Sequence, residues 1–468
     1  MKRKFTFPST YTILMVLTAI MALLTWIVPA GEYDMVKNEA LGKMVPLVGS
    51  YHSVAANPQG LWDVLMAPIQ GFYDPTTYEA RGIDIALFVI IIGAYLSVVA
   101  ETGAIDAGIA GVMKKLNGHE KWMIPILMAL FAMGGTVYGM AEETIPFYTI
   151  LVPVMLAAGY DTVVGAAIVM VGAGIGCLGS TINPFATVIA ANAAGINFMN
   201  GIGLRLTILI IGWIICTIFV MRYAAKVKAD PTRSIVYKQR AEDEAYFLHQ
   251  KSKEVPEFTL RRKIILTIFA ATFGIMIWGV SVGGWWMAQL STLFIGSSIV
   301  VGFAGRLSEK TFSERFIAGA QDLLGVALII VIARGLVVVM DNGHITHTIL
   351  HSAADVLAGL PKVPFINAVY WIEALLSFVV PSSSGLAVLS MPILAPLADF
   401  AHVSRELVVT AYQSASGLPN LITPTSGVVM GGLALSRINY FTWVRWIAPL
   451  LAILIIMIMV ILSIGVLV

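Results

Sequence analysis

Charged residues are scarce in this chain. Of its 468 residues, 12% are charged and 58% are hydrophobic, whereas a soluble globular domain carries about 25% charged residues. A water-soluble protein of this length would need far more polar surface to cover its cores. The net charge of +2 gives no reason to expect a nucleic-acid partner. The composition therefore excludes an ordinary soluble protein and indicates one that contacts the lipid bilayer.

Cysteine and common catalytic motifs are also lacking. The two cysteines, Cys177 and Cys216, each lie in an apolar stretch and predict neither a disulfide nor a metal site. The absence of a GxxxxGK[ST] phosphate loop argues against ATP-driven transport, and the absence of HExxH and GxSxG motifs argues against an intramembrane hydrolase. We therefore predict no enzymatic activity and no cofactor, with Na⁺ or H⁺ as a coupling ion.

Long apolar stretches take the place of charge. A helix needs about 20 mainly apolar residues to cross the hydrocarbon layer. Spanning or near-spanning stretches are predicted at 10–30, 82–101, 120–135, 162–178, 202–224, 262–282, 285–304, 320–340, 363–380, 404–418 and 441–468. Shorter apolar pieces at 141–158, 184–198, 385–400 and 424–436 are candidates for re-entrant hairpins or half-helices.

Lysine and arginine indicate the orientation of these stretches. Lys2, Arg3 and Lys4 precede a first stretch that is too long for a signal peptide, so we expect a cytoplasmic N-terminus. Residues 31–80 then lie outside, and the basic loop at roughly 225–261 lies inside. That loop is either a connector that fixes topology or a regulatory, partner-binding segment. We predict a multi-pass protein of the bacterial inner membrane with an N-terminal half, 1–224, and a C-terminal half, 262–468.

The two halves contain related segments. The stretch from Ala86 and the stretch from Ala327 each run from an apolar helix to an acidic residue followed by x-Gly-x-Ile, so that Glu101 aligns with Asp341 at an offset of 341 − 101 = 240. Pro184 and Pro424 share the offset, since 424 − 184 = 240. Under the predicted orientation the two units cross the membrane in opposite directions, as the inverted repeats of alternating-access transporters do. We therefore predict an all-α polytopic membrane protein with two inverted-topology repeats, each with a re-entrant hairpin and a discontinuous helix.

Each half has a break in membrane-length apolar sequence: GAGIGCLGSTINPFATVIAANAAG from Gly172 and YQSASGLPNLITPTSGVVMGG from Tyr412. Proline removes an amide donor, and irregular backbone at membrane depth must line a cavity or be buried in protein. Plain proline kinks would explain the same pattern. Otherwise the half-helix N-termini suit a substrate carboxylate, and the breaks supply candidate ligands: Ser180, Thr181, Asn183, Asn420, Thr423 and Thr425, with Na⁺ at Ser180, Asn183, Asn420 and Thr423.

Two further segments, GGTVYGMAEETIPF from Gly134 and VVPSSSGLAVLSMP from Val379, are predicted hairpin tips. A carboxylate at membrane depth is costly and indicates function. Glu142 and Glu143 could bind a substrate amino or guanidinium group, carry a proton, or pair with a basic residue. The tips add Thr144, Ser382, Ser383 and Ser384 to the candidate substrate-binding residues.

Arg334 lies deep in an apolar stretch. It could clamp a substrate carboxylate with its two-pronged guanidinium, or neutralise Glu142, Glu143 or Glu373. Glu373, in the middle of another stretch, is a weaker candidate of the same kind. His344, His347 and His351 have helical spacing, which favours a polar helix face over a metal site because no carboxylate or cysteine motif accompanies them.

Four motifs, FPSTYTILMVLTAIMALLTWIVPAGEY, GMAEETIPF, GCLGSTINPFA and PSSSGLAVLSMPILAPLADF, resemble the YfcC family. This family is related to the C4-dicarboxylate anaerobic carriers within the ion transporter superfamily, and the resemblance covers nearly the whole chain. It implies a homodimer with a scaffold domain and a mobile transport domain. The implied hairpin tips are Gly139 to Thr144 and Pro381 to Gly385, and the implied unwound connections are Gly179 to Pro184 and Gly417 to Thr425.

The resemblance implies two substrate classes. Members of the family are often labelled basic amino acid antiporters of arginine–ornithine type, and older labels call them dicarboxylate carriers. The dicarboxylate branch has Ser-Asn-Thr at its tips, whereas this chain has Ala-Glu-Glu-Thr and Ser-Ser-Ser. Two carboxylates repel a dianion and attract a cation. We therefore expect an ion-coupled symporter or exchanger of basic amino acids, with a C4-dicarboxylate carrier, and then an intramembrane enzyme or receptor, as alternatives.

Overall fold

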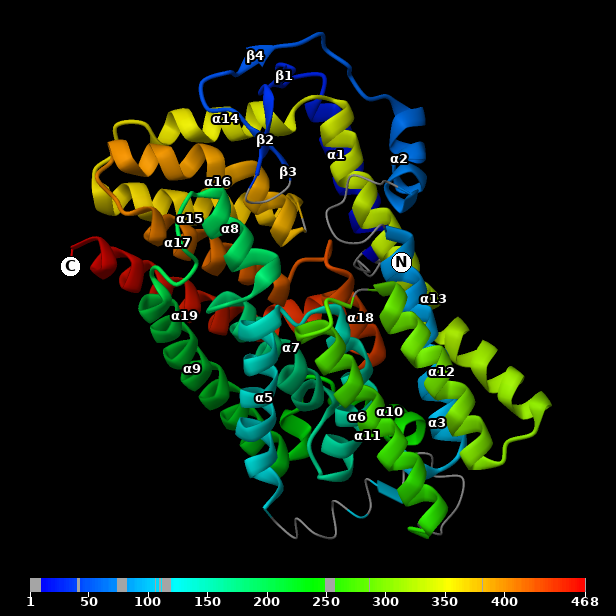
Figure 1. The fold of residues 1–468 in the computed structure, drawn as a ribbon. Coiled ribbons are helices and arrows are strands. Elements are labelled where there is room, and N and C mark those ends of the chain that lie inside the picture. The colour runs from blue at the N-terminus through cyan, green and yellow to red at the C-terminus, as the bar shows by residue number, and fades with distance from the viewer. Residues whose placement is uncertain are drawn as a thin grey trace, which may run out of the picture.

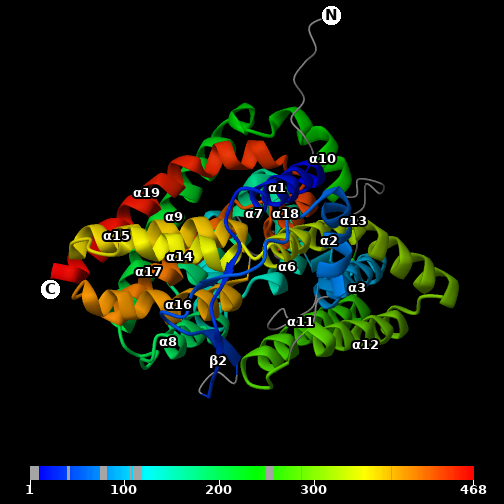
Figure 2. The same ribbon diagram turned by 90° about the horizontal axis from the view of Figure 1, so that it is seen from above.

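A computed structural model describes residues 10–39, 43–73, 82–105, 107–108, 111, 119–248, 257–285, 287–380 and 382–467. The described chain is helical apart from two pairs of short strands in residues 31–53 (Figure 1). The predicted all-α architecture therefore holds for the long apolar stretches and fails for this one polar segment. Two groups of helices, seen on opposite sides in Figure 2, make up most of the molecule.

The first group packs around its two long helices, α3 and α13, and is here named the α3–α13 bundle. Its members are α1 (Thr10–Leu24), α2 (Leu61–Tyr73), α3 (Gly82–Glu101), α11 (Leu260–Ser281), α12 (Met287–Gly305) and α13 (Glu309–Asn342). Gly93 of α3 and Gly319 of α13 bring the two backbones together, since a β-carbon on either glycine would collide with the backbone of the other helix. Small residues permit this close approach between membrane helices.

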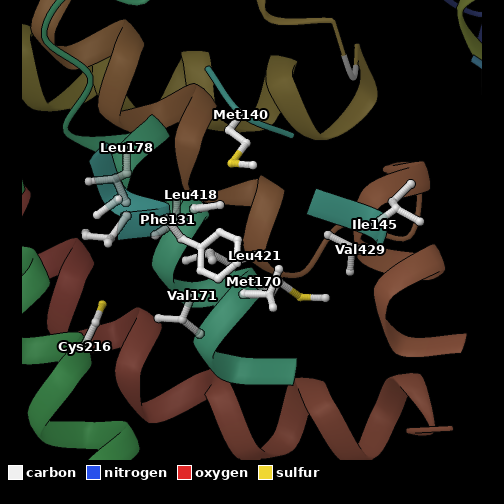
Figure 3. Close-up of a cluster of buried hydrophobic side chains, with 14 of the residues drawn as sticks. Phe131, Met140, Ile145, Met170, Val171, Leu178, Cys216, Leu418, Leu421 and Val429 are labelled. Carbon is white, nitrogen blue, oxygen red and sulfur yellow. The ribbon is translucent and has the colours of Figure 1, made fainter. Parts of the chain in front are cut away.

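The second group is named the α7–α17 bundle. Its members are α5 (Met123–Tyr138), α6 (Ile145–Ala157), α7 (Thr162–Leu178), α8 (Ile189–Ala193), α9 (Ile202–Ala229), α15 (Lys362–Val379), α16 (Ser383–Phe400), α17 (Arg405–Gly417), α18 (Gly427–Leu435) and α19 (Tyr440–Leu467). Phe131, Leu178, Leu418 and Leu421 belong to one buried apolar cluster, so helices from both ends of the sequence share a core (Figure 3). The bundles meet where α13 packs on α18 and α3 packs on α6.

Seven described helices are long and apolar enough to cross a membrane: α3, α9, α12, α13, α15, α16 and α19. The piece at 385–400 corresponds to α16, but with 18 residues this helix is long enough to span and is not too short as predicted, because Ser382 caps its start and the helix continues through Pro392 and Pro396. One predicted boundary was wrong. The stretch at 320–340 is part of the 34-residue helix α13, which begins at Glu309 after a cap by Ser308. Two other helices are shorter than the apolar stretches that predicted them. Helix α1 ends at Leu24, whereas the stretch runs to residue 30, and α17 has only 13 residues.

Residues 31–53, part of the segment predicted to lie outside the membrane, form antiparallel strands that dock on α14 (Thr346–Leu357) and α16. Strand β1 (Gly31–Glu32) pairs with β4 (His52–Ser53), and β2 (Met35–Asn38) pairs with β3 (Lys43–Pro46). The three histidines predicted to form a polar helix face hold this segment. His344 Nδ1 lies 2.5 Å from Glu32 Oε1, His347 Nδ1 accepts from Tyr33 N at 3.2 Å, and His351 stacks on Tyr51 with ring centroids 3.9 Å apart.

The connecting loop at 225–261 is partly helical. Helix α9 continues to Ala229, and two short 3-10 turns, η4 (Pro231–Arg233) and η5 (Tyr237–Gln239), lead to α10 (Arg240–Phe247). Asp161, between α6 and α7, accepts hydrogen bonds from Tyr223 Oη at 2.5 Å and Ser234 Oγ at 2.6 Å. Arg437 Nε donates to Asp243 at 3.0 Å. These bonds fasten the loop to the α7–α17 bundle.

Candidate functional site

The first predicted hairpin tip is a sharp reversal between α5 and α6. Helix α5 ends at Tyr138, and the next residue, Gly139, has a φ of 73° in the left-handed region that favours glycine. A β-carbon there would also press against the side chain of Asn183. Within the tip, Thr144 Oγ donates to the carbonyl oxygen of Ala141 at 2.6 Å, and Ala141 N donates to Glu143 Oε2 at 3.0 Å. The buried Glu143 therefore stabilises the turn.

The second tip joins α15 to α16. Ser382 caps α16 by accepting a hydrogen bond from Gly385 N at 3.2 Å. Ser416 Oγ donates to Ser383 Oγ at 3.2 Å, and Tyr412 Oη donates to the carbonyl oxygen of Ser383. The first residue of the predicted tip, Pro381, lies outside the described residues. The serines are thus held against α17 rather than exposed to lipid.

Both predicted breaks interrupt a helix. After α7, irregular backbone from Gly179 leads into the π-helical turn η3 (Pro184–Val188), and after α17 the 3-10 turn η6 (Pro419–Leu421) precedes α18. Each hairpin is bonded to the break of its own half. Thr181 N donates to Thr136 Oγ at 2.9 Å, and Thr425 Oγ donates to the carbonyl oxygen of Phe378 at 3.2 Å.

The two breaks cross each other through Gln413. Its Nε2 donates to the carbonyl oxygen of Cys177 at 2.6 Å, and its Oε1 accepts from Thr187 Oγ at 2.9 Å. A β-carbon at Gly417 would collide with the backbone of Leu178, so glycine allows the close crossing. The carbonyl oxygen freed at the end of α7 is therefore satisfied by a side chain from the other half.

A cavity of about 150 Å³ lies at this crossing. Since roughly 10–15 Å³ of such space holds one water, the cavity has room for a small metabolite. Eight predicted binding residues line it: Glu142, Thr144, Asn183, Arg334, Ser382, Ser383, Ser384 and Asn420. Sequence reasoning missed Cys177, Gln413, Ser416 and Ser426, which also line it. Their signal was present, since all four are polar or sulfur-containing side chains within the quoted breaks.

Five predicted binding residues are buried beside the cavity rather than in its lining: Glu143, Ser180, Thr181, Thr423 and Thr425. Their oxygens bond within the protein. Ser180 Oγ accepts from Thr187 Oγ at 2.9 Å, and the hydroxyls of Thr423 and Thr425 lie 2.7 Å apart. The structure therefore separates Asn183 and Asn420, at the cavity, from Ser180 and Thr423 behind it. The Na⁺ site at these four residues stays a prediction.

Glu142 and Arg334 give the cavity two opposite charges from different bundles. Glu142 comes from the tip of the first hairpin, whereas Arg334 comes from α13. Their charges attract each other. A ligand with both an acidic and a basic group would find a partner for each in one cavity. Glu373, the other acid considered as a partner for Arg334, is buried in α15 and does not line the cavity.

Comparison with known proteins supports a carrier. Residues 7–467 match the family described as "DcuC: C4-dicarboxylate anaerobic carrier". An uncharacterized protein of Haemophilus influenzae is 35% identical, with 99% of this chain and 98% of that protein covered. The Escherichia coli protein named "Putative basic amino acid antiporter YfcC" is 30% identical, with 96% of this chain and 94% of that protein covered.

Two solved structures were also matched along nearly their whole length. Neisseria gonorrhoeae MtrF, described as an antimetabolite efflux pump, has a TM-score of 0.45 and 14% identity, covering 99% of this chain and 96% of MtrF. The Alcanivorax borkumensis YdaH transporter has a TM-score of 0.41 and 13% identity, covering 98% of each chain. Both are membrane transporters by description, and at these scores neither adds to the family match.

Proposed function

The chain belongs to the C4-dicarboxylate anaerobic carrier family, and from this premise we propose that it is a secondary active transporter of amino acids, with basic amino acids as its substrates. Membership in a carrier family makes it a membrane transporter rather than an enzyme. The name of its E. coli relative, "Putative basic amino acid antiporter YfcC", supports this substrate class.

The observation that carries the proposal is the pairing of Glu142 and Arg334 in one cavity. An amino acid brings an ammonium group and a carboxylate, which are complementary to these two side chains. A basic amino acid brings a second cation, and Glu142 is the acidic side chain in the described cavity lining. Charge-assisted hydrogen bonds of this kind are roughly twice as strong as neutral ones.

A C4-dicarboxylate is the second candidate. Arg334 could hold one carboxylate as a bidentate fork, and the hydroxyls of Ser382, Ser383 and Ser384 could donate to the other. The description of the family names this substrate class. Glu142 weighs against it, because a carboxylate in the cavity repels a dianion.

The proposed mechanism is alternating access in the bacterial inner membrane, with the N-terminus in the cytoplasm. The halves 1–224 and 262–468 are the two inverted repeats, and the α7–α17 bundle is the mobile transport domain of each subunit in a homodimer. Its movement against the α3–α13 bundle would carry Glu142 relative to Arg334. Substrate exchange or symport would be coupled to H⁺ or to Na⁺ at Ser180, Asn183, Asn420 and Thr423.

The direct test is counterflow in proteoliposomes preloaded with unlabelled substrate. We expect labelled arginine to accumulate in arginine-loaded vesicles and labelled succinate not to accumulate in succinate-loaded ones. The reverse result would establish the dicarboxylate reading and give Arg334 the main role in the cavity. Accumulation of neither label by correctly folded protein would refute both substrate assignments.

Glu142→Gln tests the residue that carries the proposal. The change keeps the size of the side chain and removes its charge. Since a hydrogen bond to a charged group contributes about 1.5–3 kcal/mol, and 1.4 kcal/mol is tenfold in affinity, the apparent Kd for arginine should rise roughly ten- to hundredfold. Glu143→Gln is the matched control, because glutamine can still accept the Ala141 N–H and Glu143 does not line the cavity. Equal arginine affinity in the two variants would contradict the assignment.

A further inference from the structure

Glu373 is a buried acid that has no role in the transport mechanism proposed above. It lies in the buried face of α15 with no exposed surface. Neither of its carboxyl oxygens has a hydrogen-bond partner within the part of the chain that the structure describes. Burying an unpaired carboxylate costs far more than burying a neutral acid, so such a group is expected to take up a proton.

No charge on the neighbouring helices compensates this carboxyl. Helices α14, α16, α17 and α19 pack against α15. Their titratable groups and those of α15 itself are His347, His351, Asp355, Lys362, Tyr370, Asp399, Arg405, Glu406, Tyr412, Tyr440 and Arg445. The charges of these groups do not act on Glu373; among the described residues, the side chain that interacts with it is Ser390 of α16.

The chemistry of Ser390 favours the neutral acid. Its hydroxyl donates to the carbonyl oxygen of Leu386 at 2.8 Å, so its one hydrogen is already used. Toward Glu373 its oxygen can therefore act only as an acceptor. A carboxylate offers no hydrogen, whereas a protonated carboxyl can donate to Ser390 Oγ. A proton needs only this one site, while hard metal cations gather several oxygen ligands.

Glu373 lies close to residues that line the cavity. Ser377 lies four residues beyond Glu373 on the same buried face of α15, and residues at this spacing are neighbours on a helix. Ser377 Oγ donates to the carbonyl oxygen of Ser416 at 3.5 Å. Ser416 lines the cavity and donates to Ser383 in the second hairpin tip. Ser377 thus places a hydroxyl one helical turn from Glu373 and against a residue of the proposed substrate site.

We propose that Glu373 is the proton-binding site of this transporter: it holds a proton as a carboxylic acid in the closed interior and exchanges it with the cavity during transport. This inference rests on the proposed transport function and assigns its coupling ion as H⁺. Substrate binding at Glu142 and Arg334 and proton binding at Glu373 are then separate events at separate sites.

The test compares wild-type protein with Glu373→Gln in proteoliposomes. Glutamine keeps the shape of the neutral acid and can donate to Ser390 Oγ, but it cannot release a proton. Arginine uptake is measured with and without an imposed pH gradient of either sign, and is divided by the counterflow of the same vesicles. We expect the gradient to stimulate wild-type uptake severalfold and to leave Glu373→Gln unstimulated. Glu314→Gln, which changes an exposed acid on α13, should respond like wild type.

Stimulation of Glu373→Gln uptake to the wild-type extent would overturn the proposal, as would wild-type uptake that no pH gradient of either sign stimulates. Wild-type protein without any counterflow would instead refute the transport of arginine. In that case infrared difference spectroscopy tests, independently of transport, whether Glu373 holds a proton. A carbonyl band of a protonated carboxyl that is present in wild type and lost in Glu373→Gln supports the site, and its absence from wild type overturns it.

Discussion

Cys177 and Cys216 place two thiols in different surroundings, which makes them useful reporters at the scale of single residues. Cys177 lines the cavity, whereas Cys216 is fully buried in the core that Figure 3 shows. Their local sequences look alike, because both lie in apolar stretches. Only the crossing of α7 and α17 distinguishes them.

We predict that a small thiol-alkylating reagent labels Cys177 and blocks transport. A bulky adduct would fill a cavity of about 150 Å³ and would displace the hairpin tip, since Cys177 Sγ lies 3.7 Å from the carbonyl oxygen of Met140. Substrate in excess should slow labelling. Mass spectrometry of the alkylated peptides checks the site, with Cys177→Ser as the resistant variant and Cys216→Ser as the sensitive control. Inactivation of Cys177→Ser at the wild-type rate would show that the thiol in question is elsewhere.

How far single residues could be predicted depends on what makes them exceptional. Glu142 and Arg334 were identifiable because a charge at membrane depth is costly wherever it lies. Gln413 was not, because its importance comes from Cys177 and Thr187, which are more than 200 positions away in the sequence. Glu143 was assigned the same role as Glu142, and only the turn geometry assigns it to the backbone of Ala141.

At the scale of elements, the docking of residues 31–53 on α14 depends on a neutral imidazole. Tyr33 N donates to His347 Nδ1 at 3.2 Å, which requires that this nitrogen carry no proton. Burial is the largest influence on the pKa of His347 and lowers it below the usual value of 6.5; Glu32 opposes this effect and His344 adds to it. Protonation would therefore break the bond that holds the strand segment.

The pH dependence of stability follows from this lowered pKa. The unfolded chain takes up a proton at His347 near pH 6.5, before the folded protein does, so stability is full above that pH and is lost as the pH falls below it. One such group changes stability by at most about 1.4 kcal/mol per pH unit. Thermal unfolding on either side of pH 6.5 should show this loss, and His347→Asn should reduce it, because Asn Oδ1 replaces the acceptor. His52→Asn is the control at an exposed histidine, and an unchanged profile in His347→Asn would refute the assignment.

Element boundaries show where hydrophobic patterning works and where it fails. The apolar stretch at 82–101 coincides with α3 because nothing in it competes with the helix. Helix α16 was predicted at 385–400 but as a piece too short to span, because its serines and prolines resemble a break, yet Ser382 caps the helix and Pro392 and Pro396 are accommodated within it. The strands at 31–53 were not predicted because they are only two to four residues long, too short for a periodic pattern of their own.

At the scale of the whole molecule, the cavity lies where two bundles meet, and each bundle is built from both halves of the sequence. Glu142 and Arg334 therefore lie on different bodies, and any relative movement would separate them. The sequence repeat indicated two related halves, but it could not indicate how they interleave. That arrangement follows from long-range packing, such as α13 against α3 and α18.

The boundary between the bundles offers a test of movement that leaves the cavity lining intact. Gly427, at the start of α18, faces Ile330 of α13, and a β-carbon there would collide with Ile330 Cγ1. Overpacking a tight contact costs about 1–3 kcal/mol, so Gly427→Val should slow counterflow severalfold. Because neither residue lines the cavity, equilibrium binding of arginine should persist. Adding Ile330→Ala restores the room for the new side chain and should recover the rate, while Ile330→Ala alone controls for lost packing. If Gly427→Val binds and exchanges substrate as wild type does, the two bundles do not slide at this contact, and the transport cycle must be sought within the α7–α17 bundle.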